Sequence, residues 1–265
     1  MEIREWAERV FTAESLEEKL IAPVGGLKSL TDNEPGAPVA WSRPPRPPKL
    51  AIAEKTSRKN FPHPTALVRE DMRARCLHVF ANHELMALEM MAWALLAFPE
   101  ADKSFRKGLA NILLDEQGHF QLYSDRLQAM GVTFGDIPIN DHFWRAGADI
   151  ANPLDWVCSM HLTFEQSNLD HAPYYGRLFA EAGDAESAAL MQTIFEDEIR
   201  HVRFGARYLK SHRPEGQTMF DTFVSHCSSN NPAIRAMGPE FQTEARRLAG
   251  LDDEFIQALT LLEKP

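Results

Sequence analysis

The chain has 265 residues, of which 44% are hydrophobic and 25% are charged. These values are typical of a globular protein and exclude a mainly disordered chain, a collagen and a small disulfide scaffold. The 28 Lys and Arg residues against 38 Asp and Glu residues give a formal net charge of −10. This charge argues against a general polyanion binder, because phosphate contacts need an excess of Lys and Arg, but it leaves room for a local basic patch.

The three cysteines, at positions 76, 158 and 227, form no C-x-x-C pair. Their spacing excludes a zinc ribbon, a rubredoxin-type iron site and a thioredoxin motif, and scattered cysteines favour a reducing compartment. The first nine residues carry charges without an apolar segment, which argues against a secretory signal. The longest apolar run, 90–98, is too short to span a membrane. We therefore expect a cytoplasmic protein without membrane contact.

The N-terminal part of the sequence combines a helix with a proline-rich arm. Residues 1–20 have apolar residues spaced three or four apart, which predicts a helix. Prolines are frequent in 35–49, so an extended arm is expected over 22–64. The basic stretch 42–49 could recruit a partner as a polyproline helix. The alternative, which its linker-like composition favours, is that the arm lies over its own domain.

Four long helices are expected next, and strand signals are nearly absent. The predicted helices are 64–98, 104–130, 153–182 and 185–209. Short loops join the first to the second and the third to the fourth, and the longer connection 131–152 lies between the two hairpins. Two hairpins joined by one long crossover are typical of a ferritin-like four-helix bundle.

The predicted fold is therefore all-α and has three parts. They are an N-terminal helix and Pro-rich arm packed on the bundle (1–63), the ferritin-like bundle (64–210) and a C-terminal helical extension (211–265). Within the extension, helical pieces are expected over 218–228 and 239–262.

Each of the four long helices places a carboxylate among apolar positions, and two of them add an imidazole. The residues are Glu84, Glu116, His119, Glu165, Glu198 and His201. In each E-x-x-H pair the two side chains project from one side of a helix, so that both can bind one ion. Four converging carboxylates would repel one another in a low-dielectric core, whereas two divalent cations would cancel their four charges.

The spacing of these residues indicates a duplicated hairpin. The second hairpin repeats the ligand pattern of the first at a nearly constant offset, which pairs Glu84 with Glu165, Glu116 with Glu198 and His119 with His201. One E-x-x-H occurs by chance in many helices. Two related copies, each with a partner glutamate on the preceding helix, predict a two-metal site.

The donor set points to redox chemistry. Four carboxylates and two imidazoles suit Fe best, with Mn as an alternative, and do not favour copper or structural zinc. Two Fe(II) ions about 3.5–4 Å apart can each give electrons to O₂. The leading hypothesis is therefore an O₂-activating oxidase or monooxygenase with an organic substrate and a reductant that the sequence does not identify. The alternatives are a ferroxidase or iron-handling protein without an organic substrate, and a degenerate bundle that only binds partners.

The chain resembles the ferritin-like di-iron carboxylate superfamily over residues 64–210. Asp197-Glu-Ile-Arg-His201 fits the D-E-x-R-H motif of its oxidases, and Asp115-Glu-Gln-Gly-His119 departs from it only by glycine in place of arginine. The resemblance implies that the six Glu and His residues above are the metal ligands. The absence of paired cysteines differs from rubrerythrins.

Other segments resemble a bacterial ferritin-like family of unknown function, akin to a tRNA-hydroxylating di-iron monooxygenase. They are the opening Glu-Trp-Ala, the Pro/Arg-rich arm, His83-Glu-Leu and the closing Glu-Ala-Arg-Arg-Leu-Ala-Gly. A tRNA substrate follows from this kinship alone, and the acidic net charge argues mildly against it. The long arm and the C-terminal extension favour a monomer or dimer over a storage shell.

Several neighbours of the expected ligands are open to two interpretations. Asp115 and Asp197 could each accept a hydrogen bond from a ligand histidine, most simply on the opposite helix, or be ordinary surface charges. Tyr123, one turn after His119, could donate a hydrogen bond or an electron near the metals, or simply fill the core. His161, one turn before Glu165, is either an extra ligand or a hydrogen-bonded core residue.

Glu89 and Asp170 are a further related pair. Glu89 follows Glu84 by five residues, about 140° around the helix, so it is not expected to face the metals. The two are separated in sequence by the same offset as Glu84 and Glu165, which suggests a structural feature that both hairpins share.

Overall fold

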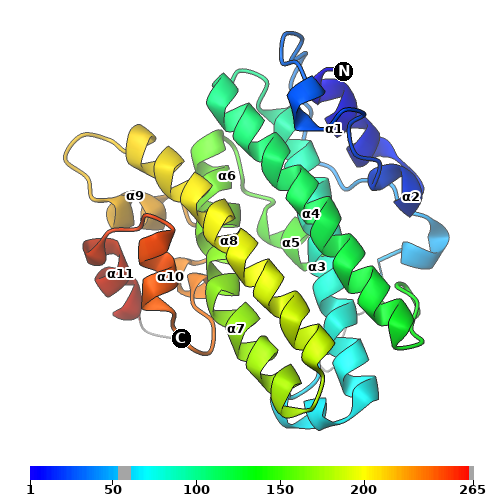
Figure 1. The fold of residues 1–265 in the computed structure, drawn as a ribbon. Coiled ribbons are helices and arrows are strands. Elements are labelled where there is room, and N and C mark those ends of the chain that lie inside the picture. Colours follow the sequence, from blue (N-terminus) through cyan, green and yellow to red (C-terminus); the bar gives the residue numbers. More distant parts are fainter. Residues whose placement is uncertain (53–60, 263–265) are drawn as a thin grey trace. The chain divides into compact units, whose positions relative to one another are not determined.

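The computed structural model describes residues 1–52 and 61–262, and this part of the chain is helical apart from its loops (Figure 1). Its one β-bridge within the described residues is isolated and joins Glu2 to Thr31. The chain forms two compact units, Met1–Arg145 and Ala146–Pro265. The all-α prediction is confirmed, and each unit contains one of the two predicted hairpins. The three-part domain division stays a prediction.

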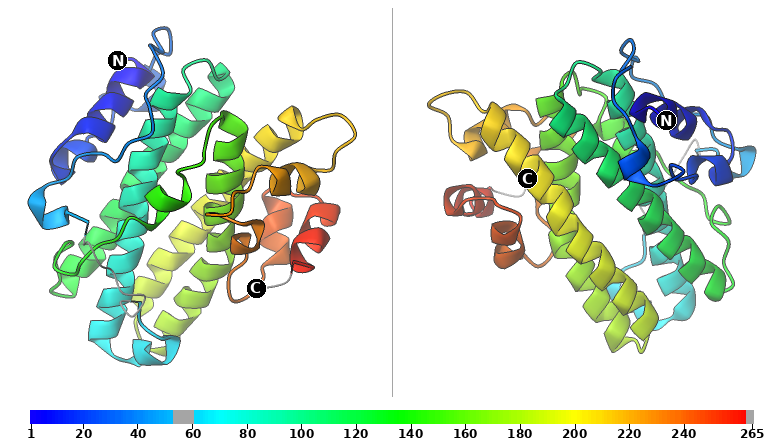
Figure 2. Two further views of the ribbon diagram at one scale, coloured as in Figure 1. Left: turned by 180° about the vertical axis from the view of Figure 1, so that it is seen from behind. Right: turned by 45° about the horizontal axis from the view of Figure 1, so that its top comes forward.

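The first unit is built around the hairpin of α3 and α4, which lie side by side in Figures 1 and 2. Its helices are α1 (Ile3–Thr12), α2 (Leu16–Lys19), η1 (Leu27–Ser29), η2 (Pro48–Leu50), η4 (Pro64–Val68), α3 (Glu70–Ala97) and α4 (Lys103–Ala129), with α5 (His142–Ala146) at the boundary. The side chain of Asp102 caps α4 by accepting a 2.8 Å hydrogen bond from the Phe105 amide. Gly131, at φ +73°, follows the end of α4, where a left-handed residue favours glycine.

Helix α3 is the centre of this unit, and almost all of its residues from Ala74 to Leu96 are buried. A helix that is apolar around its whole circumference needs cover on every side. Within this unit α4, α1 and the proline-rich arm contribute to that cover. On α1 the buried face carries Ile3, Trp6 and Val10, as the sequence predicted.

The proline-rich arm lies on its own unit, as one of the two interpretations predicted. The Val39 amide donates to the Leu96 carbonyl at 3.1 Å, and the Trp93 indole donates to the Ala40 carbonyl at 3.2 Å. The ring of Trp41 packs edge-on against Trp93, with 4.4 Å between ring centroids. Residues 53–60 of the predicted arm lie outside the described residues.

The second unit is built around the pairing of α7 with α8. Its helices are α6 (Pro153–Ser159), the π-helical turn η5 (Met160–Glu165), α7 (Gln166–Glu181), α8 (Ala185–His212), α9 (Met219–Ser225), η6 (Ala233–Ala236), α10 (Thr243–Leu248) and α11 (Asp253–Thr260). Asp184 caps α8 through a 3.0 Å hydrogen bond from the Ser187 amide.

The predicted helices differ from the observed ones in their interruptions. The segment 1–20 is divided into α1 and α2, and 64–98 begins with η4 before α3. The segment 153–182 contains the π-helical turn, and 239–262 is divided by Gly250, at φ +86°, into α10 and α11. Helix α5 lies in the expected connection 131–152. None of the helices in the described residues has the length and apolar character needed to cross a membrane.

Candidate metal centres

In the first unit the hairpin brings Glu84 of α3 toward Glu116 and His119 of α4. The Nδ1 atom of His119 lies 3.8 Å from Glu84 Oε2 and 3.6 Å from Glu116 Oε2. All three side chains are buried, and one ligand atom from each lies within 4.8 Å of the others. The E-x-x-H spacing places Glu116 and His119 on one side of α4, as expected.

In the second unit the corresponding residues lie on η5 and α8. The Nδ1 atom of His201 lies 3.9 Å from Glu165 Oε1 and 3.7 Å from Glu198 Oε2. These three residues are buried as well. Asn168 of α7 donates a 2.8 Å hydrogen bond to Glu198 Oε1. The other oxygen of this carboxylate, Oε2, is the one that lies 3.7 Å from His201.

These distances fit a shared cation better than direct hydrogen bonds. Nitrogen and oxygen atoms 3.6–3.9 Å apart are too distant for hydrogen bonding. Two ligand atoms that are each about 2.1 Å from one ion lie about 3–4 Å apart. Glu165 Oε1 is also buried without a hydrogen-bond partner, which is costly for a carboxylate oxygen unless a cation approaches it. Each unit thus offers two carboxylates and one imidazole, a donor set that suits Fe or Mn.

One interpretation of Asp115, Asp197 and Tyr123 is that they assist the metal ligands. Asp197 accepts from Arg200 one turn along α8, and its side chain is 25% exposed. Tyr123 is buried on α4, with its ring centroid 5.9 Å from that of Phe80. The pairing of Asp115 and Asp197 with histidines and the chemical role of Tyr123 stay predictions.

His161 is fully buried in the π-helical turn and hydrogen-bonded at both ring nitrogens. Its Nδ1 lies 2.5 Å from Glu165 Oε2, and the Trp156 indole donates to its Nε2 at 3.2 Å. The interpretation of His161 as a hydrogen-bonded core residue is therefore confirmed. Sequence reasoning did not identify Trp156, because a tryptophan in an apolar helix looks like ordinary core packing.

Glu89 and Asp170 are both fully buried, and in each case an arginine from a flanking extension binds the carboxylate. Arg46 of the arm donates to both oxygens of Glu89, with Nη2 2.6 Å from Oε2. Arg246 of α10 donates to both oxygens of Asp170, at 2.7 and 2.8 Å. Lys19 adds a third buried charge, 3.4 Å from Glu89. The shared structural feature expected of this pair is thus confirmed, and it is an anchor for each extension.

The three cysteine thiols are poor candidates for metal ligands. Burial raises the pKa of the Cys76 and Cys158 thiols well above the usual range and that of Cys227 to about 12. Because the thiolate is the form that binds metals and attacks electrophiles, all three groups are held in the unreactive protonated form near neutral pH.

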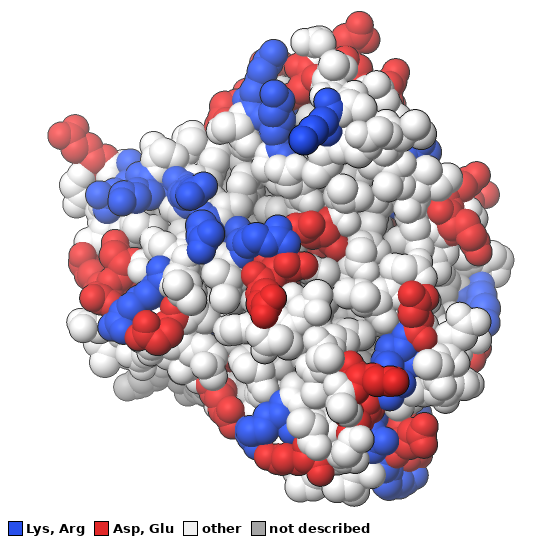
Figure 3. Space-filling view, in the orientation of Figure 1, with Lys and Arg blue, Asp and Glu red and all other residues white. Residues whose placement is uncertain are grey.

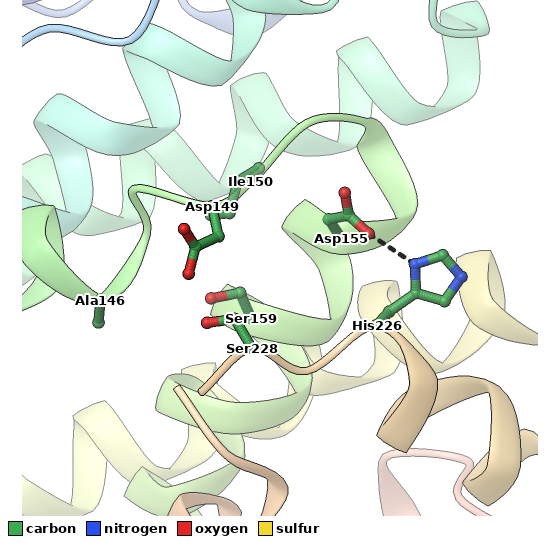
Figure 4. A pocket seen from close by; sticks show the side chains of 7 residues that line it. All are labelled: Ala146, Asp149, Ile150, Asp155, Ser159, His226 and Ser228. Carbon is green, nitrogen blue, oxygen red and sulfur yellow. Dashed lines mark hydrogen bonds and ion pairs between the residues drawn. The ribbon is translucent and has the colours of Figure 1, made fainter. Parts of the chain in front are cut away.

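A small pocket in the second unit contains a histidine–carboxylate pair outside the metal sets (Figure 4). His226 Nδ1 lies 2.6 Å from Asp155 Oδ1. Ser159 and Ser228 also line the pocket, but Figure 4 shows their hydroxyl groups apart from the His226 ring. The serine, histidine and aspartate therefore do not form a hydrolase triad. The contact instead ties the end of α9 to the start of α6.

Basic residues recur along the outer side of α8, in the band of Lys and Arg that Figure 3 shows there. They are Arg200, Arg203, Arg207 and Lys210, of which all but the half-buried Arg203 are exposed. Arg200 pairs with Asp197, and Arg203 donates to the Leu248 carbonyl at 2.8 Å. Two of the four basic groups therefore already contact their own unit.

With this geometry established, the comparisons with known proteins place the chain in a family. The family model "Protein of unknown function (DUF455)" matches residues 4–257. The chain belongs to this family. It is also 24% identical over 169 residues to an "Uncharacterized protein" of Haemophilus influenzae, a match that covers 61% of this chain. The chain spans 57% of that relative's length. No solved structure matches the chain.

Proposed function

We propose that this member of the DUF455 family is a two-metal carboxylate protein of the ferritin-like type, which uses iron and O₂ to oxidise an organic substrate. The observation that carries the proposal is the buried Glu, Glu, His set that each unit forms from its copy of the repeated motif. A chance E-x-x-H on a helix surface would have solvated side chains, whereas all six of these are buried. Within each set the His and Glu ligand atoms lie 3.6–3.9 Å apart, and buried ionisable groups that converge in this way favour a functional site.

The charges of the chain suit this role. Each unit has two ligand glutamates, which together balance one divalent cation when both are ionised. They are Glu84 and Glu116 in the first unit and Glu165 and Glu198 in the second. The ligand nitrogen of His119 and of His201 must be unprotonated to bind an ion. Bound iron would supply the electrons that O₂ accepts. The protein would hold the ions, fix the orientation of the carboxylates and exclude bulk water.

Anaerobic loading with Fe(II) tests the proposal. We expect two iron ions per chain and, after exposure to O₂, a Mössbauer spectrum in which both ions are ferric. Glu198→Gln should lower the iron content toward one ion per chain, because it replaces a ligand charge by a neutral amide. Glu196→Gln is the matched control, since Glu196 lies exposed on the same helix and pairs only with Gln192 among the contacts described.

The same experiment distinguishes the remaining alternatives. Repeated Fe(II) oxidation that accumulates many irons per chain in a very large oligomer would favour iron handling without an organic substrate. Binding of Mn(II) in place of Fe(II), under equal availability, would change the assigned metal. If the wild-type protein binds neither ion at micromolar concentrations, the two-metal proposal is wrong.

A further inference from the structure

A chain of two hydrogen bonds connects a buried tryptophan to the metal-ligand candidate Glu165. The Trp156 indole Nε1 lies 3.2 Å from His161 Nε2, and His161 Nδ1 lies 2.5 Å from Glu165 Oε2. Trp156 and His161 have no exposed surface, and Glu165 is 5% exposed. Water therefore cannot easily replace either contact.

The donor properties of these groups fix the tautomer of His161. An indole N–H can only donate, so the Nε2 atom that faces it accepts and carries no proton. A neutral imidazole then has its proton on Nδ1. His161 therefore donates from Nδ1 to Glu165 Oε2, and the indole is what selects this direction.

The hydrogen bond from His161 leaves Glu165 with two different oxygens. Oε2 is held by the imidazole, whereas Oε1 is buried without a hydrogen-bond partner and lies 3.9 Å from His201 Nδ1. The carboxylate thus presents Oε1 to the ligand set. A buried donor that fixes the orientation of a ligand commonly strengthens metal binding.

The fold holds the His161 ring in place from several sides. A Cβ atom on Gly205 of α8 would lie 2.6 Å from the His161 Cβ, so only glycine allows this close approach. The ring of Phe204 stands edge-on to the imidazole, with 4.9 Å between centroids. His161 and Glu165 both belong to the π-helical turn η5, and π-helical turns are frequent at functional sites.

The first sequence repeat lacks this arrangement. Four residues before Glu84 the sequence has Phe80, and nine residues before it Arg75, at the positions that His161 and Trp156 occupy relative to Glu165. A phenylalanine has no hydrogen-bonding group, so Phe80 cannot hold Glu84 in this way. The two halves therefore differ at a residue next to a ligand.

We propose that His161, with its tautomer fixed by Trp156, is a positioning residue that orients Glu165 for metal binding in the second unit only. The inference rests on the proposed two-metal function. It predicts that one metal site, and not the other, depends on His161. The asymmetry follows from the sequence, because the first repeat has phenylalanine in place of this histidine.

A Co(II) titration in competition with a chelator tests this inference on the full chain. His161→Phe reproduces the residue of the first repeat and should lower the affinity of one of the two Co(II) ions by about 10- to 100-fold. The visible absorption of that ion should change, whereas the band of the other ion should not. His161→Asn should restore most of the affinity, because its amide nitrogen can donate from nearly the position of Nδ1. The melting temperature of each metal-free variant shows whether the substitution also changes the stability of the fold, apart from its effect on metal affinity.

A second measurement needs no metal. Nitrogen-15 NMR of the metal-free protein, labelled at histidine, should show a His161 ring protonated on Nδ1, and Trp156→Phe should weaken this preference. Protonation on Nε2 would overturn the inference, as would equal binding of both Co(II) ions by wild type and His161→Phe. A wild-type protein that binds no divalent ion would instead overturn the two-metal function and this inference with it.

Discussion

His78 is a buried histidine whose environment opposes protonation. The Gly135 amide donates to its Nε2 at 2.9 Å, and its ring stacks on Phe134 at 4.9 Å. Burial lowers its pKa from 6.5 to about 4, and a nearby Asp136 offsets only part of this effect. The neutral form is therefore the one that the folded protein accommodates.

This lowered pKa predicts a loss of stability in mild acid. Below pH 6.5 the unfolded chain gains a proton at His78 that the folded chain takes up only near pH 4. The stabilisation is complete above pH 6.5 and decreases as the pH falls toward 4, by up to about 3 kcal/mol. His78→Gln keeps an acceptor for the Gly135 amide and cannot titrate. Urea unfolding should show a weaker pH dependence for this variant, and an identical slope would contradict the prediction.

Two helical glycines should respond oppositely to alanine. Gly118 is exposed on α4 with open space where a Cβ atom would lie, so Gly118→Ala should stabilise the protein by about 0.5–1 kcal/mol. In Gly205→Ala the new Cβ atom would press against His161, so this variant should destabilise the protein by about 1–3 kcal/mol. Thermal unfolding of the two variants measures both effects. Equal shifts would mean that η5 and α8 can separate without cost.

The buried ion pairs show how the extensions are fixed to the helical elements. Arg246 holds both oxygens of Asp170 and lies 3.8 Å above the Phe241 ring, and both charged side chains are fully buried. The amides of Gly238 and Gln242 donate to the same carboxylate. A buried charge that loses its partner costs far more than an exposed one.

Neighbouring arginines on α10 therefore provide a matched test. Arg246→Met leaves Asp170 buried without its counter-charge and should lower the free energy of unfolding by about 3–5 kcal/mol. Arg247→Met removes exposed ion pairs with Glu244 and Asp253 and should leave the urea midpoint almost unchanged. If both variants unfold at the same urea concentration, α10 is not anchored through Asp170.

The sequence predicts helices better than it predicts their interruptions. Apolar periodicity identified α4 and α8 to within a few residues, because each has a long buried face and clear end signals. It also identified α3, except that the predicted start at residue 64 falls in η4. The π-helical turn was not visible, since one widened turn changes the periodicity too little. The ion pairs of Arg46 and Arg246 with buried carboxylates were not predicted either. They form because a segment distant in sequence covers a helix, and no local sequence pattern indicates which segment does so. For the site, repetition identified all six ligand candidates, but the role of Trp156 required its tertiary contact with His161.

For the whole chain, the buried carboxylates connect metal binding to stability. Each unit holds two glutamates of its ligand set in its interior, where ionisation without a counter-ion is costly. An ion that binds only the folded state adds about 2.7 kcal/mol of stability per site at one hundred times its dissociation constant. The metal-free protein should accordingly be the less stable form.

Chelation should thus lower the melting temperature of the wild-type protein. A ligand variant in one unit should lose only the part of this difference that the ion of that unit contributes. We expect Glu116→Gln and Glu198→Gln each to remove the stabilisation that one bound ion contributes, because each replaces a charged ligand in only one unit. Their melting temperatures in excess chelator should stay at or above the wild-type value, since a buried negative charge is lost. Calorimetry with Fe(II) under argon and with chelator measures both states. Equal melting temperatures with metal and with chelator would show that the six buried side chains do not bind an ion.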